Sequence, residues 1–305
     1  MEKIFKIIIV KMTIIVYNKD GKRGKKMEER NEQGQTLKEF LDSYDASRYR
    51  NPSNTVDMLL FTVRDGQLQL LLIKRRNHPW INQWALPGGF VDFDEDIDKA
   101  VLRELAEETN VSQATYFRQL YTLGKADRDP RTRVITTAYL SLSPLENLKD
   151  MHSGDDARDA GWFTVRKQTV RESEQERISR VSLSGSVEIS YEITETVEHN
   201  YIKRSSQLLS EEQLACDHIK LVNMAIDRLR SEAISSGLLF NLLPEKFTLK
   251  EVQTVFEAVS GQKVDTPNFR RGIISKLIPT EEYRKNRKAA RLYRFNPLYR
   301  HMEGD

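Results

Sequence analysis

The residues best suited to chemistry lie in one stretch, residues 88–111, where a glycine pair leads into an acidic segment. Positions 92–108 carry eight carboxylates and only two basic residues. A helix that begins near Asp96 and turns by about 100° per residue gathers its apolar side chains in one broad arc. That arc consists of Ile97, Ala100, Val101, Leu102 and Leu105.

Three glutamates lie on or beside this arc. Glu104 and Glu108 fall inside it and Glu107 lies at its edge, whereas a solvated helix would carry its acids on the opposite face. Carboxylates that face the protein must be neutralised by bases or by a metal ion. Their i,i+3 and i,i+4 spacing predicts that the three side chains converge, and clustered carboxylate oxygens suit Mg²⁺ or Mn²⁺. The alternative is an acidic helix on the surface.

The same stretch resembles the Nudix box of the Nudix hydrolases. The residues that carry the resemblance are Gly89, Glu95, Arg103-Glu104-Leu105, Glu107-Glu108 and Val111. The one departure is Asn110, where the family has glycine. This position ends the helix in a left-handed conformation, which Asn tolerates second best, so the substitution leaves the metal ligands intact.

The resemblance implies a catalytic set and a metal site. Glu104, Glu107 and Glu108 would bind Mg²⁺ or Mn²⁺ together with backbone oxygen from the region of Gly89, and Glu95 would pair with Arg103 to orient the helix. Nudix hydrolases cleave nucleoside diphosphates linked to another group. The metal would neutralise the pyrophosphate and activate water for in-line attack. The general base stays open between these glutamates and an acid from another loop.

The surrounding segments read as strands that end in basic residues. Strands are predicted at 54–63 and 68–73, joined by a turn at Asp65-Gly66, and at 116–123 and 134–142. Arginines that follow the second strand, or that lie between the last two, can hold a substrate phosphate. These candidates are Arg75, Arg76, Arg128 and Arg131. The alternatives are a solvated strand end and a salt-bridged turn.

Two tryptophans and an insertion complete this part of the chain. Trp80 and Trp84 are more typical of core packing than of base stacking. Residues 168–207 depart from a compact Nudix domain, and the alternation around Ser184-Gly185 predicts an inserted β-hairpin. It would extend the sheet, join a dimer interface or shape substrate access.

A capping box at Ser210 predicts an amphipathic helix that ends near Ser231. Cys216 and His218 fall on this helix. Neither has a metal-ligand partner at a useful spacing, so we interpret both as structural.

The C-terminal part of the chain is basic. Thr248 caps a predicted helix, a turn follows at 261–265, and Pro267 opens a second helix. Residues 281–295 read as a β-hairpin, and residues 268–300 carry ten Lys or Arg and two acids. This order predicts a winged helix-turn-helix, whose second helix enters the major groove and whose wing holds phosphates.

This segment resembles the C-terminal domain of the NrtR-like, Nudix-related transcriptional regulators of bacteria. The resemblance rests on Phe240-Asn-Leu-Leu-Pro244, Phe247-Thr248-Leu249, Asn268-Phe269-Arg270-Arg271 and Ala290-Arg291-Leu292-Tyr293-Arg294-Phe295. It implies double-stranded DNA as a partner and a homodimer on two half-sites. The DNA contacts would come from Asn268, Arg270, Arg271, Lys276, Arg284, Lys285, Arg287, Lys288 and Arg291. The alternatives are an RNA-contacting, protein-binding or dimerisation domain.

Composition agrees with a two-domain globular protein. The chain has 305 residues, of which 39% are hydrophobic and 30% charged. A single cysteine excludes a disulfide framework and fits a reducing compartment, so we expect a cytoplasmic protein. The net charge of +3 is unevenly spread between the acidic box and the basic C-terminal part, which indicates two different partners.

Residues 1–35 form an extension of unusual composition. The run from Ile8 to Tyr17 is nearly all apolar but is interrupted by Lys11, and it is too short to span a membrane. No signal-peptide cleavage site is evident. We interpret the extension as non-native or unfolded, with Met27 as the more natural start, and we expect no stable membrane association. The alternative is a membrane-associating N-terminus.

These observations predict an α+β fold in three parts. The extension 1–35 precedes a Nudix hydrolase domain at 36–231, an α/β/α sandwich with a mixed sheet and an inserted hairpin, and a winged helix-turn-helix at 238–300. We expect Mg²⁺-dependent hydrolysis, of ADP-ribose to AMP and ribose 5-phosphate by resemblance to the regulator group, together with DNA binding. The alternative is a repressor whose Nudix domain mainly senses ADP-ribose or a related sugar nucleotide. The complete set of charged box residues favours hydrolysis, and the two hypotheses are compatible.

Overall fold

A computed structural model describes the chain in two compact units, residues 1–51 and 52–305. The described residues are 7–10, 13–16, 29–109, 111, 116–148, 157–233, 237–284 and 289–302. Asn110, the departure from the Nudix pattern, therefore lies outside them. Residues 1–6, 11–12 and 17–28 also lie outside them. Among the described residues, no helix has the length and apolar character needed to cross a membrane.

The elements described in the first unit are short. Strands β1 (Ile7–Val10) and β2 (Thr13–Val16) pair antiparallel. Helix α1 (Leu37–Ser43) begins where Thr36 and Glu39 form a reciprocal capping box, and the 3-10 helix η1 spans Ala46–Arg48.

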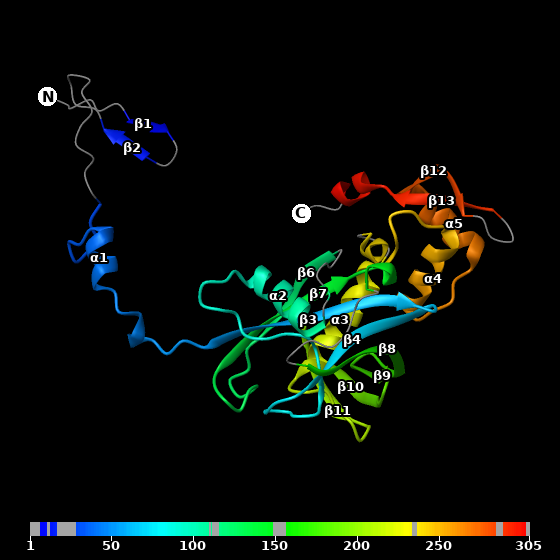
Figure 1. The fold of residues 1–305 in the computed structure, drawn as a ribbon, viewed down its shortest axis with the longest axis horizontal. Helices are drawn as coiled ribbons and strands as arrows, with labels where there is room; N and C mark the ends of the chain where they lie inside the picture. Colours follow the sequence, from blue (N-terminus) through cyan, green and yellow to red (C-terminus); the bar gives the residue numbers. More distant parts are fainter. Residues whose placement is uncertain are drawn as a thin grey trace. The chain divides into compact units, whose positions relative to one another are not determined.

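The second unit is organised around one mixed sheet of nine strands (Figure 1). The strands are β3 (Ser53–Arg64), β4 (Gln67–Arg75), β5 (Trp84–Ala85), β6 (Tyr116–Leu123), β7 (Val134–Leu142), β8 (Ala157–Glu172), β9 (Glu176–Ser184), β10 (Glu188–Glu198) and β11 (Tyr201–Leu208). They lie in the order β11-β10-β9-β8-β4-β3-β7-β6, with β5 beside β4, and within this sheet only β3 and β7 pair in parallel. The β3–β4 turn is at Asp65-Gly66, as predicted, and both residues have the positive φ that a two-residue hairpin turn requires.

The remaining elements are mainly helical, apart from a C-terminal hairpin. They are α2 (Ile97–Thr109), η2 (Leu145–Leu148), α3 (His218–Glu232), η3 (Leu238–Leu242), α4 (Leu249–Ser260), α5 (Thr266–Ile273), η4 (Ile274–Lys276), β12 (Leu277–Arg284), β13 (Ala290–Phe295) and η5 (Pro297–Met302).

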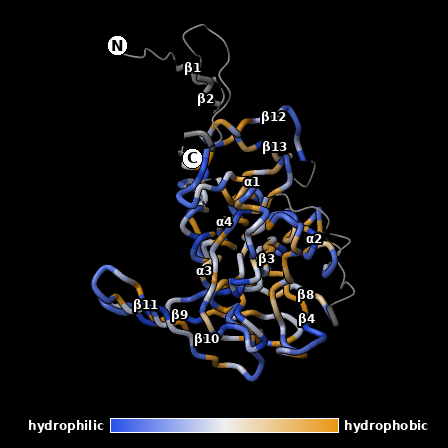
Figure 2. The backbone as a smooth tube through the Cα atoms, turned by 90° about the vertical axis from the view of Figure 1, so that its left-hand side faces the viewer, coloured by the Kyte–Doolittle hydropathy of each residue, from blue (hydrophilic) through white to orange (hydrophobic). Residues whose placement is uncertain are grey.

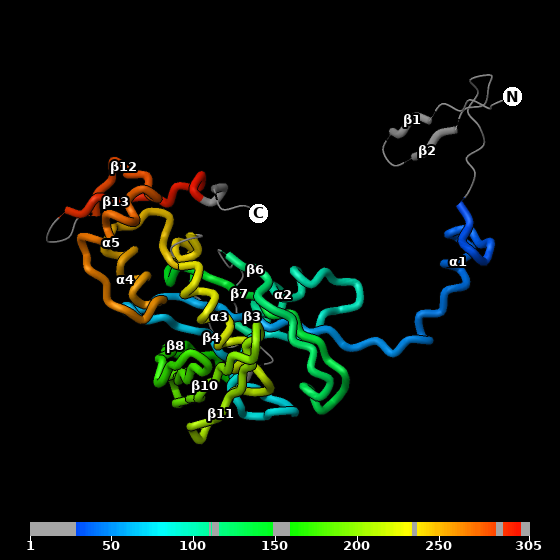
Figure 3. Tube along the Cα trace, turned by 180° about the vertical axis from the view of Figure 1, so that it is seen from behind, coloured from blue at the N-terminus to red at the C-terminus, as the bar shows by residue number. Residues whose placement is uncertain are grey.

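Helices α2 and α3 cover opposite faces of the sheet. Successive side chains of a strand point to opposite faces, so neighbours on β3 report the two layers. Met58 and Leu60 pack in the hydrophobic cluster that contains Leu105 of α2. Leu59 and Phe61 pack in the other cluster, which contains α3. The predicted sandwich with a mixed sheet is confirmed, and Figure 3 shows α3 on the face away from α2.

Strands β8 to β11 extend the sheet beyond β4 as an antiparallel meander. Ser184 pairs with Glu188 across the turn where the sequence predicts a hairpin. A long β8 and the added β11 flank that hairpin, so the extension is larger than predicted. Of the three roles considered, the segment takes the first and extends the sheet. Strand β11 is exposed along its length and largely hydrophilic (Figure 2).

The helix predicted to start at Ser210 begins only at His218, so that prediction was wrong. The hydroxyl of Ser210 accepts the N–H of Ser190 at 2.8 Å and donates to the carbonyl of Glu212 at 2.7 Å. These bonds attach the segment to β10 instead of capping a helix, because the side chain of serine can satisfy other backbone groups equally well. Cys216, with a φ of 52°, then turns the chain into α3.

The C-terminal elements form the predicted winged helix. Thr248 begins α4 through a capping box with Glu251, and Gly261 ends it in the left-handed conformation. Strands β12 and β13 form the wing, which starts at Leu277 rather than near residue 281. Phe247 adds a third strand position by exchanging two backbone hydrogen bonds with Tyr293, at 3.0 and 2.8 Å.

One continuous hydrophobic cluster joins the sheet to the winged helix. Leu221 and Leu229 of α3 belong to it together with Val252 and Val255 of α4 and residues of the central strands. Helix α3 therefore packs on the sheet and on the first helix of the C-terminal domain at the same time.

Candidate ligand pocket and nucleic-acid interface

A pocket of about 340 Å³ opens where α2, the β6–β7 loop and the start of α3 meet the sheet. It is lined by residues from β3, β4, α2, the loop and the segment before α3. They are Thr55, Val56, Asp57, Ile73, Arg75, Arg76, Asn77, Trp80, Leu86, Gly88, Gly89, Phe90, Asp92, Arg103, Glu104, Glu108, Arg128, Asp129, Arg131, Val134, Ala215, Cys216 and His218.

Arg103 is the central cation of the α2 wall. Its guanidinium donates to both oxygens of Glu95, at 3.0 and 2.8 Å, and to Glu104 at 2.8 Å and Glu107 at 3.2 Å. It also reaches the carbonyl of Phe90 at 3.1 Å. The bonds to Glu95 raise the pKa of Arg103 and lower the pKa of Glu95. The predicted pairing of these two side chains is present, and it ties the turn before α2 to the helix.

The box glutamates occupy three different environments. Glu108 is 7% exposed, and burial raises its pKa to about 8 although its carboxylate accepts the N–H of Gly88 at 2.6 Å. Glu104 is partly buried, and burial likewise raises its pKa against the opposing effect of Arg103. Glu107 is exposed and does not line the pocket.

The predicted convergence is only partial: Glu104 and Glu107 accept from the same Nη1 of Arg103, but only Glu104 and Glu108 line the pocket, and a metal ion held by all three stays a prediction. Glu104 and Glu108 share the pocket, whereas Arg103 holds Glu107 at the surface. Across the described residues, no three His, Cys, Asp or Glu side chains are arranged to hold a metal ion. The donor chemistry nevertheless suits a hard divalent cation, because a nearby positive charge would offset the raised pKa values of two carboxylates.

Gly88 and Gly89 bring the backbone close to these acids. A Cβ on Gly89 would lie 2.3 Å from an oxygen of Glu104, so no other residue fits without displacing that carboxylate. The carbonyl of Gly89 accepts the N–H of Val56 at 2.9 Å, which leaves it a second lone pair.

All four arginines predicted to hold a substrate phosphate line this pocket. Arg75 donates to the carbonyl of Pro79 at 3.0 Å and lies 5.9 Å from the ring centroid of Trp80. Burial lowers the pKa of Arg75. Arg76 is exposed beside it.

The two loop arginines are also held by carboxylates. Arg131 binds both oxygens of Asp129, at 3.1 and 2.9 Å, and lies 5.2 Å from the ring centroid of Phe90. Arg128 has a side chain only 4% exposed and binds Asp217 at 2.8 Å. The alternative of a salt-bridged turn thus describes their bonding, although the turn itself forms part of the pocket wall.

The tryptophans divide between the two roles considered. Trp84 is fully buried and packs edge-on against Phe163, with ring centroids 4.8 Å apart. Trp80 is partly buried and packs against the cluster of Ile73, Ala85 and Ala215, and it also lines the pocket. Its φ of 60° belongs to the loop that follows β4.

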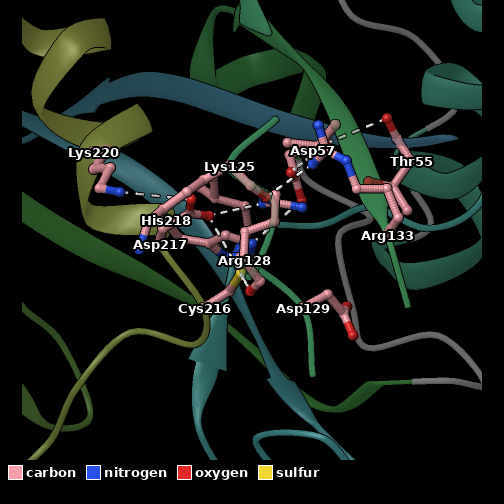
Figure 4. Close-up of polar contacts among 12 residues, drawn as sticks. Thr55, Asp57, Lys125, Arg128, Asp129, Arg133, Cys216, Asp217, His218 and Lys220 are labelled. Carbon is pink, nitrogen blue, oxygen red and sulfur yellow. Dashed lines mark hydrogen bonds and ion pairs between the residues drawn. The ribbon is translucent and has the colours of Figure 1, made fainter. Parts of the chain in front are cut away.

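The sequence interpretation missed a buried polar group at the start of α3 (Figure 4). Nδ1 of His218 accepts the N–H of Leu86 at 3.0 Å, and its Nε2 lies 3.4 Å from Asp57. Burial lowers the pKa of His218, so the ring is neutral with its proton on Nε2. Asp57 also accepts the hydroxyl of Thr136 at 2.6 Å. An aspartate inside the apolar run of β3 was the available signal, because a buried carboxylate needs partners.

Cys216 lies beside this group. Its thiol is 3.2 Å from the carbonyl of Arg128 and from a carboxylate oxygen of Asp217, and burial raises its pKa to about 12. Cys216 and His218 remain structural in their bonding, but both also form pocket wall.

The predicted DNA contacts on α5 form an exposed group. Asn268, Arg270 and Arg271 are all exposed, and Asn268 accepts a hydrogen bond from Arg271. Asp265 and Pro267 start the helix, so these side chains lie along its first two turns. The second helix of a winged helix reads the major groove with residues near its N-terminus.

Lys276 was wrongly predicted to contact DNA. It is 6% exposed, and its ammonium lies 4.1 Å from the ring centroid of Tyr299. The turn after α5 places it under the C-terminal segment, where it forms a cation–π contact. Lys285, Arg287 and Lys288 lie outside the described residues.

The predicted DNA contacts on the described part of the wing, Arg284 and Arg291, are bonded to protein groups. Arg284 binds Glu251 of α4. Arg291 donates to the carbonyl of Thr280 at 2.9 Å and to Glu281 at 3.3 Å. Both side chains remain partly exposed at the surface.

The fold and the pocket define a Nudix-type domain followed by a winged-helix DNA-binding domain. Residues 53–181 match the NUDIX domain family, and residues 239–295 match the NrtR DNA-binding winged helix domain.

Known proteins of both kinds are similar to this chain. The "ADPR responsive transcriptional repressor NtrR" of Acinetobacter baylyi is 31% identical over 261 residues, which cover 84% of this chain and 87% of that protein. The crystal structure of Shewanella oneidensis NrtR complexed with a 27mer DNA is 30% identical, with a TM-score of 0.58 over 81% of this chain and 95% of that one. An ADP-ribose pyrophosphatase of Methanocaldococcus jannaschii is 33% identical over 132 residues, 42% of this chain and 73% of that protein. The chain belongs to the NrtR family of Nudix-related transcriptional regulators.

Proposed function

We propose that this protein is a DNA-binding repressor whose Nudix domain is the receptor for ADP-ribose or a related sugar nucleotide. The observation that carries the proposal is the pocket, in which four arginines lie opposite Glu104 and Glu108 on a chain that also bears a winged helix. Guanidinium groups bind diphosphate oxygens in pairs, and the aromatic rings of Trp80 and Phe90 offer stacking surfaces. The name of the Acinetobacter repressor supports ADP-ribose as the ligand.

The same pocket supports hydrolysis as a second candidate function. Glu104 and Glu108 would hold a Mg²⁺ or Mn²⁺ ion, with the carbonyl of Gly89, while Arg103 fixes the helix. Such an ion, when bound, would screen the diphosphate and lower the pKa of an attacking water. His218 is not the base in this arrangement, because Leu86 occupies its Nδ1 and its Nε2 carries the proton. The similarity to a pyrophosphatase supports this candidate.

On DNA, the exposed side chains of α5 would read the major groove. Asn268, Arg270 and Arg271 would provide base and phosphate contacts. The wing would contact the phosphate backbone of the DNA. We propose a homodimer on two half-sites, acting in the cytoplasm.

One experiment separates receptor from enzyme. ADP-ribose turnover with Mg²⁺ would be followed by phosphatase release of phosphate from the AMP and ribose 5-phosphate formed. If the native chain hydrolyses ADP-ribose, the double variant Glu104→Gln, Glu108→Gln should lose at least about 100-fold in turnover, and Glu107→Gln should lose less.

The result in the native chain decides between the candidates. No turnover, but a rise in melting temperature with ADP-ribose, would support the receptor and overturn the enzyme. If ADP-ribose is not hydrolysed and does not stabilise the protein, both candidates have the wrong ligand.

A further inference from the structure

The start of α3 is attached to the ligand pocket through an ion pair. Arg128 of the β6–β7 loop binds Asp217, which directly precedes α3, at 2.8 Å, and both side chains are largely buried (Figure 4). Burial opposes ionisation of Asp217, but the hydrogen bond and charge of Arg128 outweigh it, so the pKa of Asp217 lies below its usual value. The next residue, His218, closes the pocket wall.

Arg128 keeps an unused donor beside the pocket. Its Nε is buried and has no hydrogen-bond partner among the described residues. A buried donor without a partner costs about 1–3 kcal/mol, so a ligand that supplies an acceptor is favoured there. A diphosphate offers several charged oxygens and matches the guanidinium fork.

The side chain of Asp217 does not cap α3. It occupies the position before α3, where an aspartate usually accepts a backbone N–H of the first turn, yet its side chain makes no such bond. Its carboxylate accepts from Arg128 instead of from a backbone N–H of the first turn. Lys220, in the first turn, lies 3.8 Å from the other oxygen and could take part of that charge.

The far end of α3 is attached to the winged helix. Arg230 donates to the carbonyl of Val259, near the C-terminus of α4, at 3.3 Å, and to the carbonyl of Lys167 on β8 at 2.8 Å. Its guanidinium also lies 3.0 Å from where a Cβ on Gly261 would be, just before the turn into α5. Helix α3 is thus bonded at one end to the pocket wall and at the other to α4 of the winged helix and to β8 of the sheet.

We infer that the diphosphate of the bound ligand takes Arg128 from Asp217, and that a small shift of the packed helix α3 transmits this exchange through Arg230 to α4 and, through the turn at Gly261, to α5. This inference rests on the proposed receptor function and assigns its regulation. The exchange is reversible because a buried ion pair adds little net stability, so a stronger acceptor can displace one partner. Asp217 then gains the helix N-terminus as its partner.

The inference is tested by comparing the linkage between ligand and DNA in variants of the full chain. DNA affinity would be measured by fluorescence anisotropy with and without saturating ADP-ribose, on a duplex selected from a random library. ADP-ribose affinity would be measured by calorimetry. We expect ADP-ribose to change the DNA Kd of the native chain at least 10-fold.

Asp217→Asn removes the competitor for Arg128. It should bind ADP-ribose about 5-fold more tightly, show a DNA Kd near the ligand-bound value without ligand, and reduce the linkage below about 2-fold. Arg230→Ala should keep native ADP-ribose affinity and lose the linkage, and Arg230→Lys should restore part of it. Arg228→Ala, which removes an intrahelical ion pair between partly exposed Arg228 and Glu232, is the matched control and should couple as the native chain does.

The outcomes are distinguishable. A native chain that binds no ADP-ribose, or binds it without any change in DNA affinity, would contradict the proposed function. Native linkage that persists unchanged in folded Asp217→Asn and Arg230→Ala variants would overturn the α3 route alone. Melting curves identify any variant that does not fold, and the two ends of the helix provide independent tests.

Discussion

The ligand pocket and the α5 surface both concentrate charge, but they hold it in opposite ways. In the pocket, Glu108 and the side chain of Arg128 are buried, Arg103 is partly buried, and all three are bonded to fixed partners. On α5, Arg270 and Arg271 are exposed. Removing one partner of a buried pair leaves an uncompensated charge, whereas an exposed charge contributes little to folding.

This difference suits the two tasks. A small anionic ligand is selected by groups already held in place, because little ordering remains to be done on binding. DNA phosphates are contacted through mobile cations that release counterions. Substitutions in the pocket should therefore change stability, and substitutions on α5 should change mainly affinity and its salt dependence.

Replacing Arg103 should have the largest effect on stability. Arg103→Ala leaves Glu95 and Glu104 partly buried without their common cation, and we expect a loss of about 3 kcal/mol in the free energy of unfolding. Urea unfolding followed by circular dichroism measures it. Lys99→Ala on the same helix removes an exposed pair with Asp96 and should change stability by less than about 0.5 kcal/mol. Equal losses in the free energy of unfolding for the two variants would contradict the difference between partly buried and exposed charges.

Glu108 should make stability depend on pH in buffer without divalent cations. Its pKa is raised to about 8, so its neutral form contributes stability that is fully present below pH 4.5 and is lost as the pH rises through about 8. Glu108→Gln stays neutral, and its advantage over the native chain should grow by on the order of 2 kcal/mol from pH 5 to pH 8. Melting curves in chelator measure this. If the stability of the two proteins changes with pH in the same way, burial does not raise the pKa of Glu108.

The smallest stability effects should be on α5. Arg270→Ala and Arg271→Ala should each weaken DNA binding about 10-fold and reduce the salt slope by about 1, with less than about 0.5 kcal/mol change in stability. Lys276→Ala should instead cost about 1 kcal/mol of stability through its contact with Tyr299 and leave the salt slope unchanged. A reduced salt slope in Lys276→Ala would return Lys276 to the DNA surface.

Local patterns predicted much of this molecule. The strand bounds 116–123 and 134–142 agree with β6 and β7, and the helical arc correctly separated buried Glu108 from exposed Glu107. These features depend on periodicity along one element. The resemblance to the Nudix box and to the winged helix then supplied the order of the domains.

What the sequence did not reveal depends on residues that are distant in the chain. His218 becomes pocket wall because it meets Asp57 and Leu86, and no local pattern links these positions. The basic composition of residues 268–300 suggested that Lys276 contacts a DNA phosphate. In the structure Lys276 is buried against Tyr299. The start of α3 shifted because Ser210 found a partner on β10.

The central claim is that one chain joins an ADP-ribose pocket to a DNA-binding surface. The most direct measurement is the DNA affinity of the full chain with and without ADP-ribose at fixed salt, with the ligand's own binding measured in parallel. We expect ligand binding and a change of at least about 10-fold in the DNA Kd. Tight DNA binding that does not respond to bound ADP-ribose would contradict it.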